Sequence, residues 1–459
     1  MEISKIMDLQ LDQINSQLRS GEIKIAVVGI GRIGLPTAIL FAQSGLPTFG
    51  VDINKKLVEK INNQFFPLDD EPGMKQIFDD VMMHKKLIAT IDIHHALSQV
   101  NVVILSLPTP MTKDNIPDYS SLQSVAQQLH DFLLPHSLVI VESTVEPGFV
   151  ENILIPIIEG KDKKLEAGKT FGIGVCPETA NPGEILKDFK TLPRLVGGID
   201  KKSSELISMI YSYVFLVDLI QMPDCKTANA VKLTTNVFRD VNIAFVNELA
   251  ILYEKLGIDI FTVLDAAKRK YNFQVHYPGS GVGGPCLPVN SYQIINSARS
   301  NSLPIPKLVS ISREINEQMP LHTLELLKDA LSSIDKKIEK STIGILGISY
   351  KPNVKDIQLA PAEKIVSELQ SLECNVKIFD PYFISTTAFS IKTEQKVEDV
   401  ILNSDAVLVL TAHQDFFSIN PELFNKLMKK SIVIDTRGVF DIMELKKLKI
   451  IFRGIGRPN

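Results

Sequence analysis

The chain of 459 residues has only four cysteines, Cys176, Cys225, Cys286 and Cys374, and no CxxC pair. So few cysteines in so long a chain predict neither a disulfide framework nor a structural zinc site. We therefore expect a reducing, cytoplasmic compartment and no bound metal.

Long apolar runs are also missing. No stretch approaches the ~20 apolar residues that cross a bilayer as a helix. Residues 1–21 alternate polar and apolar at helical spacing and lack the apolar block of a signal peptide, so we expect a short helix there. The net charge of −4 comes from interspersed charges of both signs, which argues against a nucleic-acid or membrane surface.

The remaining pattern predicts an α/β protein of three parts, because the length exceeds what one hydrophobic core usually supports. Strands are predicted at KIAVVG, PTFGVDI, NVVILSLP, LVIVEST and FGIGVCPE, separated by helical segments. This alternation is typical of a doubly wound parallel sheet, and it returns from about residue 340 in TIGILGISY, NVKIFDP, DAVLVLTAH and SIVIDTRG. Between them, residues 224–256 predict one long helix. We expect Rossmann-like domains at 1–205 and 326–459 and a helical domain at 206–325.

A glycine-rich turn follows the first predicted strand and opens a helix. It comprises Gly29, Ile30, Gly31, Arg32, Ile33 and Gly34, a GxGxxG pattern. Gly29 permits the tight turn, Gly31 lets the backbone approach a pyrophosphate, and Gly34 permits close packing of helix and strand. Asp52 ends the second strand about 20 residues downstream, where a carboxylate binds the adenine ribose and disfavours a 2′-phosphate. NAD is the predicted cofactor, although Arg32 by itself is better explained as a solvated loop residue.

One cysteine has an unusual context. Cys286 lies in GVGGPCLP at 281–288, where backbone N–H groups favour a thiolate and an oxyanion. Cys225 and Cys374 lack such a context and are interpreted as inert, whereas Cys176, beside Pro177, stays open.

Three polar residues of the long helix are candidates for the same chemistry. Lys232 and Asn236 share a helix face, and Arg239 continues the stripe. Lysine and asparagine in a mostly apolar helix are suited to bind a developing oxyanion, although a solvated face explains the spacing equally well. Glu178 follows a predicted strand end and is a candidate general base, with helix capping as the alternative.

Together these residues predict a four-electron oxidation. A primary alcohol loses hydride to NAD, the thiolate traps the aldehyde, a second hydride leaves, and water hydrolyses the thioester to a carboxylate. This sequence of steps needs a nucleophilic cysteine, an oxyanion donor and a base.

The order of further motifs resembles the nucleotide-sugar 6-dehydrogenase family, and its N-acetylhexosamine branch, over nearly the whole chain. The motifs are LPTP at 107–110 with PD at 117–118, EST at 142–144, CPE at 176–178, TLPR at 191–194 with VGG at 196–198, NVFRDVNIAF at 236–245 with NELA at 247–250, GGPC at 283–286, YKP at 350–352, DPY at 380–382 and DTR at 435–437.

This resemblance implies an NAD-binding domain, a homodimer formed through the central helix, and a C-terminal domain that binds a UDP-sugar. It implies Cys286 as the nucleophile, Lys232 and Asn236 as oxyanion and alcohol partners, and Glu178 as the base in hydrolysis. The implied cofactor contacts add Pro108, Thr109 and Thr144. The implied substrate contacts are Glu178, Lys232, Asn236, Arg239, Tyr277, Gly279, Gly283 and Lys351, with Arg239 crossing the dimer interface.

Several positions depart from the family pattern. Asn290 stands where the family usually has Asp, Asn229 where it has Glu, and Gln358 where it has Arg. Thr179 and Phe149 also differ. Asn cannot accept a proton at neutral pH, so these changes mark either a sub-branch with an altered substrate or a weakened enzyme.

The sequence thus predicts an NAD-dependent UDP-N-acetylhexosamine 6-dehydrogenase, with UDP-N-acetylmannosamine as the first substrate and UDP-N-acetylglucosamine close behind. UDP-glucose is disfavoured because CPET at 176–179 replaces an NPEF-type sequence. One rival is a nucleotide-sugar binder without activity, supported by Asn290 and Gln358. Another is a two-electron hydroxy-acid dehydrogenase, which leaves the cysteine loop unexplained.

Overall fold

The computed structural model describes residues 5–458 and divides into two compact units. Of the described residues, the first unit comprises 5–235 and 292–302, and the second comprises 236–291 and 303–458. The predicted N-terminal helix is present as α1 (Leu11–Ser20), preceded by the short helix η1 (Ile6–Asp8), while residues 1–4 lie outside the described part. Within residues 5–458, no helix combines the length and apolar character needed to cross a membrane.

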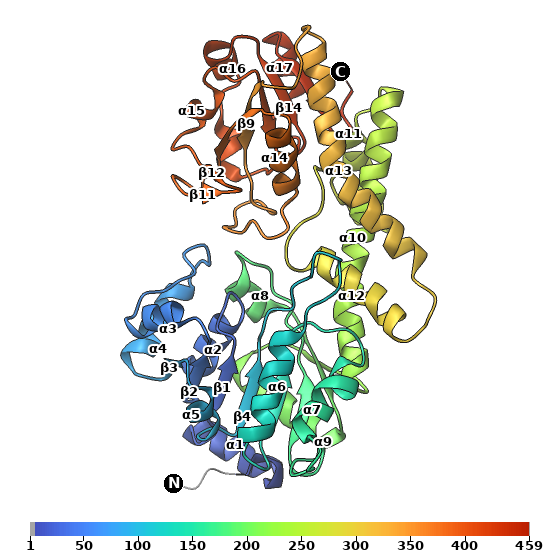
Figure 1. The fold of residues 1–459 in the computed structure, drawn as a ribbon. Coiled ribbons are helices and arrows are strands. Elements are labelled where there is room, and N and C mark those ends of the chain that lie inside the picture. The colour runs from blue at the N-terminus through green and yellow to red at the C-terminus, as the bar shows by residue number, and fades with distance from the viewer. Residues whose placement is uncertain (1–4, 459) are drawn as a thin grey trace. The chain divides into compact units, whose positions relative to one another are not determined.

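An eight-stranded sheet forms the centre of the first unit, in the order β3-β2-β1-β4-β5-β6-β7-β8 (Figure 1). Its strands are β1 (Ile25–Val28), β2 (Thr48–Val51), β3 (Leu87–Thr90), β4 (Val102–Leu105), β5 (Leu138–Val141), β6 (Gly172–Val175), β7 (Arg194–Gly198) and β8 (Leu219–Gln221). All neighbours are parallel except β6 and β7. The sequence had not indicated β3, β7 or β8.

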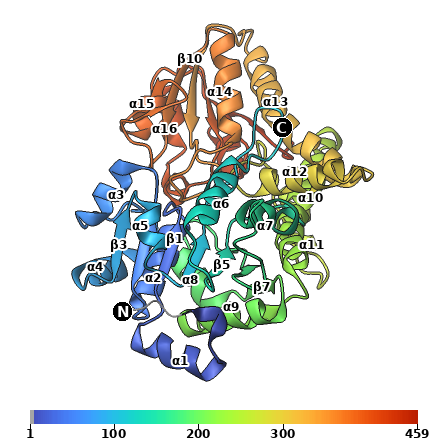
Figure 2. The same cartoon turned by 60° about the horizontal axis from the view of Figure 1, so that its bottom comes forward.

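Helices cover both faces of this sheet because its strands are apolar on both sides. Ile25 and Val27 of β1 belong to one hydrophobic cluster, whereas Ala26 and Val28 belong to another, as the two-residue period of a strand requires. The helices are α2 (Gly34–Gln43), α3 (Lys55–Asn62), α4 (Met74–Met83), α5 (Ile93–Leu97), α6 (Ser120–Phe132), η2 (Val150–Leu154), α7 (Ile155–Glu159), α8 (Ile185–Thr191) and α9 (Lys201–Val214). Helices α2 and α9 pack on the first cluster, and α6 and α7 on the second (Figure 2).

The second unit contains a five-stranded parallel sheet in the order β10-β9-β13-β14-β15. Its strands are β9 (Thr342–Leu346), β10 (Asn375–Phe379), β13 (Ala406–Val409), β14 (Ile432–Asp435) and β15 (Ile451–Gly454), with a small hairpin of β11 (Thr387–Ala388) and β12 (Ile391–Lys392). Its helices are α11 (Ile260–Ala267), α13 (Lys307–Ser332), α14 (Pro361–Ser371), α15 (Val397–Ile401), η3 (Gln414–Ser418), α16 (Glu422–Leu427) and α17 (Ile442–Lys447). The second predicted α/β pattern is confirmed.

Two helices belong partly to each unit. Helix α10 (Cys225–Leu256) confirms the predicted long helix, and α12 (Leu287–Ser300) follows the cysteine loop. Helix α10 begins where the Asp224 carboxylate accepts a hydrogen bond from the Thr227 N–H, at 2.7 Å. It ends at Gly257, whose φ of +71° lies in the left-handed region that terminates helices. The boundaries predicted near residues 205 and 325 stay predictions.

Candidate active site

The predicted glycine turn connects β1 to α2 at the carboxyl edge of the first sheet. Gly29 has φ +89°, and a Cβ there would lie 2.5 Å from the Ser106 carbonyl oxygen. A Cβ on Gly34 would collide with the carbonyl oxygen of Gly29, whereas a Cβ on Gly31 would meet nothing within 4 Å. Gly29 and Gly34 are therefore required by the turn itself, and Gly31 leaves open space where a pyrophosphate fits.

This difference predicts opposite effects of two alanine substitutions. Gly34→Ala should lower the free energy of unfolding by about 1–3 kcal/mol, because the backbone of the turn must move. Gly31→Ala should leave the melting temperature near wild type but raise the KM for NAD about tenfold or more, because its methyl group fills the cradle. Thermal unfolding and NAD titration of both variants test this. Equal losses of stability in the two variants would contradict the assignment.

Asp52 closes the turn from the end of β2. One carboxylate oxygen accepts a hydrogen bond from the Ile30 N–H at 3.1 Å, and the other from the Asn54 N–H at 2.9 Å. Arg32, predicted as part of the cofactor turn, forms ion pairs with Asp70 at 2.7 Å and Glu71 at 2.9 Å. The Arg32 side chain is thus held in place by two carboxylates, which a solvated loop residue would not be.

The next two strand ends carry further predicted cofactor contacts. Pro108 and Thr109 follow β4, and Thr144 follows β5. The Ser143 hydroxyl accepts a hydrogen bond from the Leu107 N–H at 2.8 Å, and the Thr109 hydroxyl donates to the Thr144 carbonyl at 3.1 Å. The two loops are therefore fixed to each other along the edge where ligands meet open α/β sheets.

Glu178 follows β6 at the same edge and is buried, with its carboxylate accepting from the Ala180 N–H. Beneath it, the fully buried Glu142 accepts hydrogen bonds from Tyr211 at 2.8 Å and Thr37 at 3.1 Å. Burial raises the pKa of Glu142 to about 7, although the Arg194 guanidinium and these hydrogen bonds oppose the shift. The sequence missed this cluster, although EST at 142–144 and TLPR at 191–194 were its visible signals.

Cys176, which the sequence left open, lies in this buried cluster. Its side chain is fully buried, and burial raises the pKa of its thiol to about 12. Since the nucleophile must be a thiolate, this cysteine is inert at neutral pH.

In the second unit, Cys286 is exposed and immediately precedes α12. Its carbonyl accepts the first hydrogen bond of that helix, from the Asn290 N–H at 2.8 Å. The thiol therefore sits at the positive end of a helix dipole, which favours negative charge on sulfur. The sequence had predicted the N–H groups of a glycine loop for this purpose, and the helix N-terminus adds to them.

Asn236 and Asn290 bring α10 and α12 together next to the cysteine. The Asn236 amide donates a hydrogen bond to Asn290 Oδ1 at 2.6 Å, and both side chains are buried. Lys232 lies one turn before Asn236 on α10 and is also buried. Arg239, one turn further along α10, is exposed, and its role stays a prediction.

A buried ion pair, which the sequence did not indicate, holds this arrangement. The Asp240 carboxylate accepts hydrogen bonds from Arg313 at 2.8 Å, Asn316 at 2.7 Å and Ser291 at 2.7 Å. The three partners come from α13 and α12, so Asp240 connects α10 to both helices.

The glycines around the cysteine are required mainly by packing within the second unit. A Cβ on Gly279 would collide with the Arg437 guanidinium, and one on Gly283 with the Leu359 carbonyl. A Cβ on Gly284 would lie 2.6 Å from the Tyr350 ring. Predicted contacts of Gly279 and Gly283 with substrate stay predictions. Tyr277 is 44 % exposed and stacks on Phe261.

Lys351 lies in the loop after β9, and buried residues at neighbouring strand ends hold that loop. His413 Nε2 lies 3.0 Å from Asp380, and Nδ1 accepts a hydrogen bond from the Asn353 N–H at 3.0 Å. The Asp380 carboxylate also accepts from the Ile348 N–H at 2.8 Å and the Ser349 N–H at 3.1 Å. Because Nδ1 is the acceptor, the proton of the ring lies on Nε2 and points to Asp380.

A dinucleotide-type turn with an acidic strand end, combined with a cysteine at a helix N-terminus, is typical of an NAD-dependent oxidoreductase that forms a covalent intermediate. Models of the UDP-glucose/GDP-mannose dehydrogenase family match the chain at residues 23–215 for the NAD binding domain, 226–318 for the central domain and 344–442 for the UDP binding domain. The chain therefore belongs to the UDP-glucose/GDP-mannose dehydrogenase family, and it is an NAD-dependent UDP-sugar dehydrogenase.

Similar proteins span nearly the whole chain. A UDP-N-acetyl-D-mannosamine dehydrogenase of Pyrococcus horikoshii is 35 % identical over 438 residues, which cover 95 % of this chain and 100 % of the relative. One of Methanocaldococcus jannaschii is 31 % identical over 95 % of this chain and 97 % of its own length. The solved structure of a UDP-D-ManNAc dehydrogenase from Pyrococcus horikoshii matches with a TM-score of 0.87 at 34 % identity, covering 95 % of this chain and 99 % of that one.

Proposed function

We propose that the protein oxidises the C6 alcohol of UDP-N-acetyl-D-mannosamine to the uronate, with Cys286 as nucleophile. The observation that carries this proposal is the exposed Cys286 at the N-terminus of α12, one turn from the Asn236–Asn290 hydrogen bond. Two relatives support this substrate, because they are named for UDP-N-acetyl-D-mannosamine and match over 100 % and 97 % of their length.

The chemistry balances as two successive oxidations and one hydrolysis. The residues Gly29–Gly34 and Asp52 would hold NAD, which would supply the hydride acceptor in each oxidation, and Gly31 leaves open space at this turn. The C6 alcohol loses a proton and a hydride to give the aldehyde, and the Cys286 thiolate adds to that aldehyde. Loss of a proton and a second hydride from the thiohemiacetal gives a thioester, and water then releases the carboxylate and a proton and regenerates the thiol.

The remaining polar groups stabilise the negative charge on oxygen and transfer the protons. Lys232 and Asn236 donate hydrogen bonds to the oxyanion that forms when the thiolate attacks. Glu178 takes the proton from the water that hydrolyses the thioester. Asn290 cannot accept a proton, so it orients Asn236 through its Oδ1 while the transfer falls to Lys232 and Glu178.

A panel of UDP-sugars assayed for NADH tests this function. We expect two NADH for each UDP-N-acetylmannosamine consumed, with UDP-N-acetylglucosamine and UDP-glucose turned over more slowly. A preference for either of those sugars would replace the substrate but keep the reaction. One NADH per substrate would point to a two-electron dehydrogenase, and tight binding of UDP-sugars without NADH would point to a binding protein.

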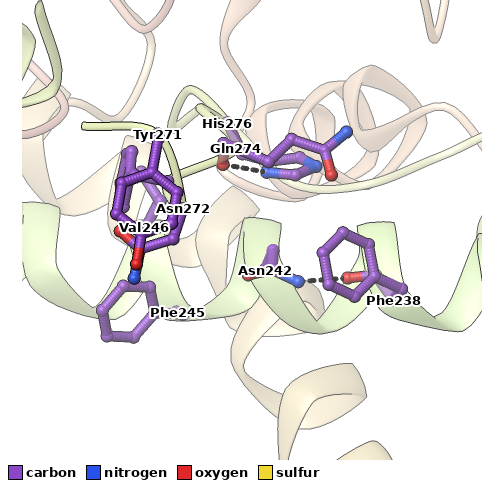
Figure 3. Close-up of a pocket in the computed structure, with 9 residues that line it drawn as sticks. Phe238, Asn242, Phe245, Val246, Tyr271, Asn272, Gln274 and His276 are labelled. Atoms are coloured by element: carbon purple, nitrogen blue, oxygen red, sulfur yellow. Dashed lines mark hydrogen bonds between the residues drawn. The ribbon is translucent and has the colours of Figure 1, made fainter. Parts of the chain in front are cut away.

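A homodimer through α10 is the second part of the proposal. Phe238, Phe245 and Leu252 recur on one face of α10 and are exposed by 47 %, 48 % and 48 %. Figure 3 shows Phe238, Asn242 and Phe245 of α10 lining a groove under the segment 271–276. Exposed apolar side chains that recur along one helix face are typical of an interface, and a second copy presents the same face. Arg239 is exposed on the same helix, and we propose that it contacts the substrate of the other copy.

Phe245→Glu should convert the dimer into a monomer, because dimerisation would bury a charge in the apolar face. Sedimentation velocity of wild type and variant measures the change. Leu216→Glu is the matched control, since Leu216 is 91 % exposed and belongs to the connection between α9 and β8, not to α10. A Phe245→Glu variant that stays dimeric would contradict the interface.

The cytoplasmic location inferred from the cysteines stays a prediction.

A further inference from the structure

Arg32 of the glycine turn is held by two carboxylates from a distant part of the chain. Its side chain is 22 % exposed, while those of Asp70 and Glu71 are 7 % and 1 % exposed. The guanidinium donates to Asp70 at 2.7 Å and to Glu71 at 2.9 Å. These are charge-assisted hydrogen bonds at low exposure, where solvent screens them little.

Glu71 also holds a third segment. Its Oε1 accepts a hydrogen bond from the Gly183 N–H at 2.7 Å, and its Oε2 accepts from the Ile185 N–H at 3.2 Å. The Leu186 side chain packs near Gly73, where a Cβ would lie 3.0 Å from it. A single carboxylate therefore joins the cofactor turn to the start of α8.

The segment that Glu71 anchors begins at the proposed base. Glu178 accepts a hydrogen bond from the Ala180 N–H, so the carboxylate and the backbone that follows it are fixed to each other. Asn181 donates two hydrogen bonds to Asp188, at 2.8 Å from its backbone and 2.9 Å from its side chain. The stretch from Glu178 to Ile185 is therefore held by hydrogen bonds at both of its ends.

We propose that Glu71 is a positioning residue that couples cofactor at the glycine turn to the segment carrying Glu178. A pyrophosphate bound at the glycine turn would attract the Arg32 guanidinium and thereby weaken its hydrogen bond to Glu71. The Glu71 carboxylate then redistributes its hydrogen bonds between Arg32 and the two backbone N–H groups. The segment 178–185 thus responds to whether a dinucleotide is bound. The coupling to catalysis rests on the proposed role of Glu178.

Hydrogen exchange tests the coupling without any turnover. In wild type, saturating NAD should change the exchange rates of the amides at residues 180–185 by about tenfold. In Glu71→Gln this response should disappear, because the amide group of glutamine presents a donor to Arg32 or Ile185. Asp70→Asn is the matched control: it disturbs the same arginine without touching 183–185, so the response should remain.

A second variant, Arg32→Ala, tests the same coupling if Glu71→Gln does not fold. This variant keeps the hydrogen bonds from Gly183 and Ile185 to Glu71 but removes the ion pair between Arg32 and Glu71. The amides at residues 180–185 should therefore stay protected from exchange, and their exchange rates should no longer change when NAD binds. An NAD response that persists in Arg32→Ala and Glu71→Gln would overturn the proposal. So would a wild-type segment that shows no response.

A kinetic measurement then tests whether Glu71 affects hydrolysis of the thioester. In Glu71→Gln the first NADH should form at a rate within about threefold of wild type, while steady-state turnover falls about tenfold. Intact-protein mass spectrometry should show an acyl group accumulating on Cys286. Equal slowing of both stages without an adduct would refute the link to Glu178. A wild-type enzyme that makes no NADH from any UDP-sugar would refute the proposed function and leave the exchange experiment interpretable.

Discussion

Replacement of Cys286 by alanine should abolish UDP-sugar oxidation, with steady-state NADH formation falling by at least about 10⁴-fold. Without the thiol, the aldehyde has no covalent partner, so neither the thiohemiacetal nor the thioester forms. The fold should be unaffected, because Cys286 is exposed at the start of α12. NADH absorbance with UDP-N-acetylmannosamine, together with the mass of the protein after mixing, measures both effects.

The other cysteines provide the control. Cys374 is half-buried, and its thiol donates to the Ile338 carbonyl at 3.1 Å. Cys374→Ala should keep wild-type turnover, and iodoacetamide should label Cys286 long before the buried Cys176 and Cys225. If Cys286→Ala keeps both NADH equivalents, the covalent mechanism is wrong whatever the substrate.

The fold was predictable wherever local signals were strong. The long helix at 224–256 was recognisable because Asp224 begins it, Gly257 ends it, and the residues between contain no breaker. Strand β7 was missed because two glycines end it, and β8 because its three residues are largely exposed. Such strands form because neighbouring strands offer hydrogen bonds, a tertiary effect that local propensity does not carry.

The site was predictable in its reactive residues and not in their partners. The conformational demands on Gly29 and Gly34 are local, so the GxGxxG pattern was enough to indicate them. The partners of Arg32 lie 38 and 39 residues away in sequence, and Asp240 lies 73 residues from Arg313. Ion pairs between residues so far apart in sequence depend on how the helices pack, so the spacing of residues along the chain does not predict them.

The glycine-rich segment around Cys286 shows that a sequence pattern can be recognised while its structural reason is not. The sequence explained its glycines by the needs of the thiol, whereas Gly279, Gly283 and Gly284 pack against Arg437, Leu359 and Tyr350. A glycine required for close packing and one required for a ligand leave the same pattern in a sequence. The loop is thereby fixed to the edge of the second sheet, and this gives Cys286 a rigid base.

Asp240→Ala should produce the largest loss of stability among single substitutions of the candidate site, about 3–5 kcal/mol in the free energy of unfolding. Removing the carboxylate leaves the Arg313 guanidinium buried without its main counter-charge. It also removes the hydrogen-bond acceptor of Ser291 on the first turns of α12, next to the cysteine. We therefore expect kcat to fall together with the midpoint of thermal unfolding, measured by circular dichroism and NADH formation.

Two further variants separate the buried charge from other effects. Glu317 contacts the same arginine at 3.1 Å, but its side chain is 42 % exposed, so Glu317→Gln should cost under about 1 kcal/mol. Combining Asp240→Leu with Arg313→Met removes both charges and should recover much of the stability lost by Asp240→Ala, because apolar replacement of a buried ion pair is often neutral. Its kcat should stay low if Asp240 also fixes α12 through Ser291. A full recovery of kcat would show that the ion pair stabilises the unit without orienting the cysteine.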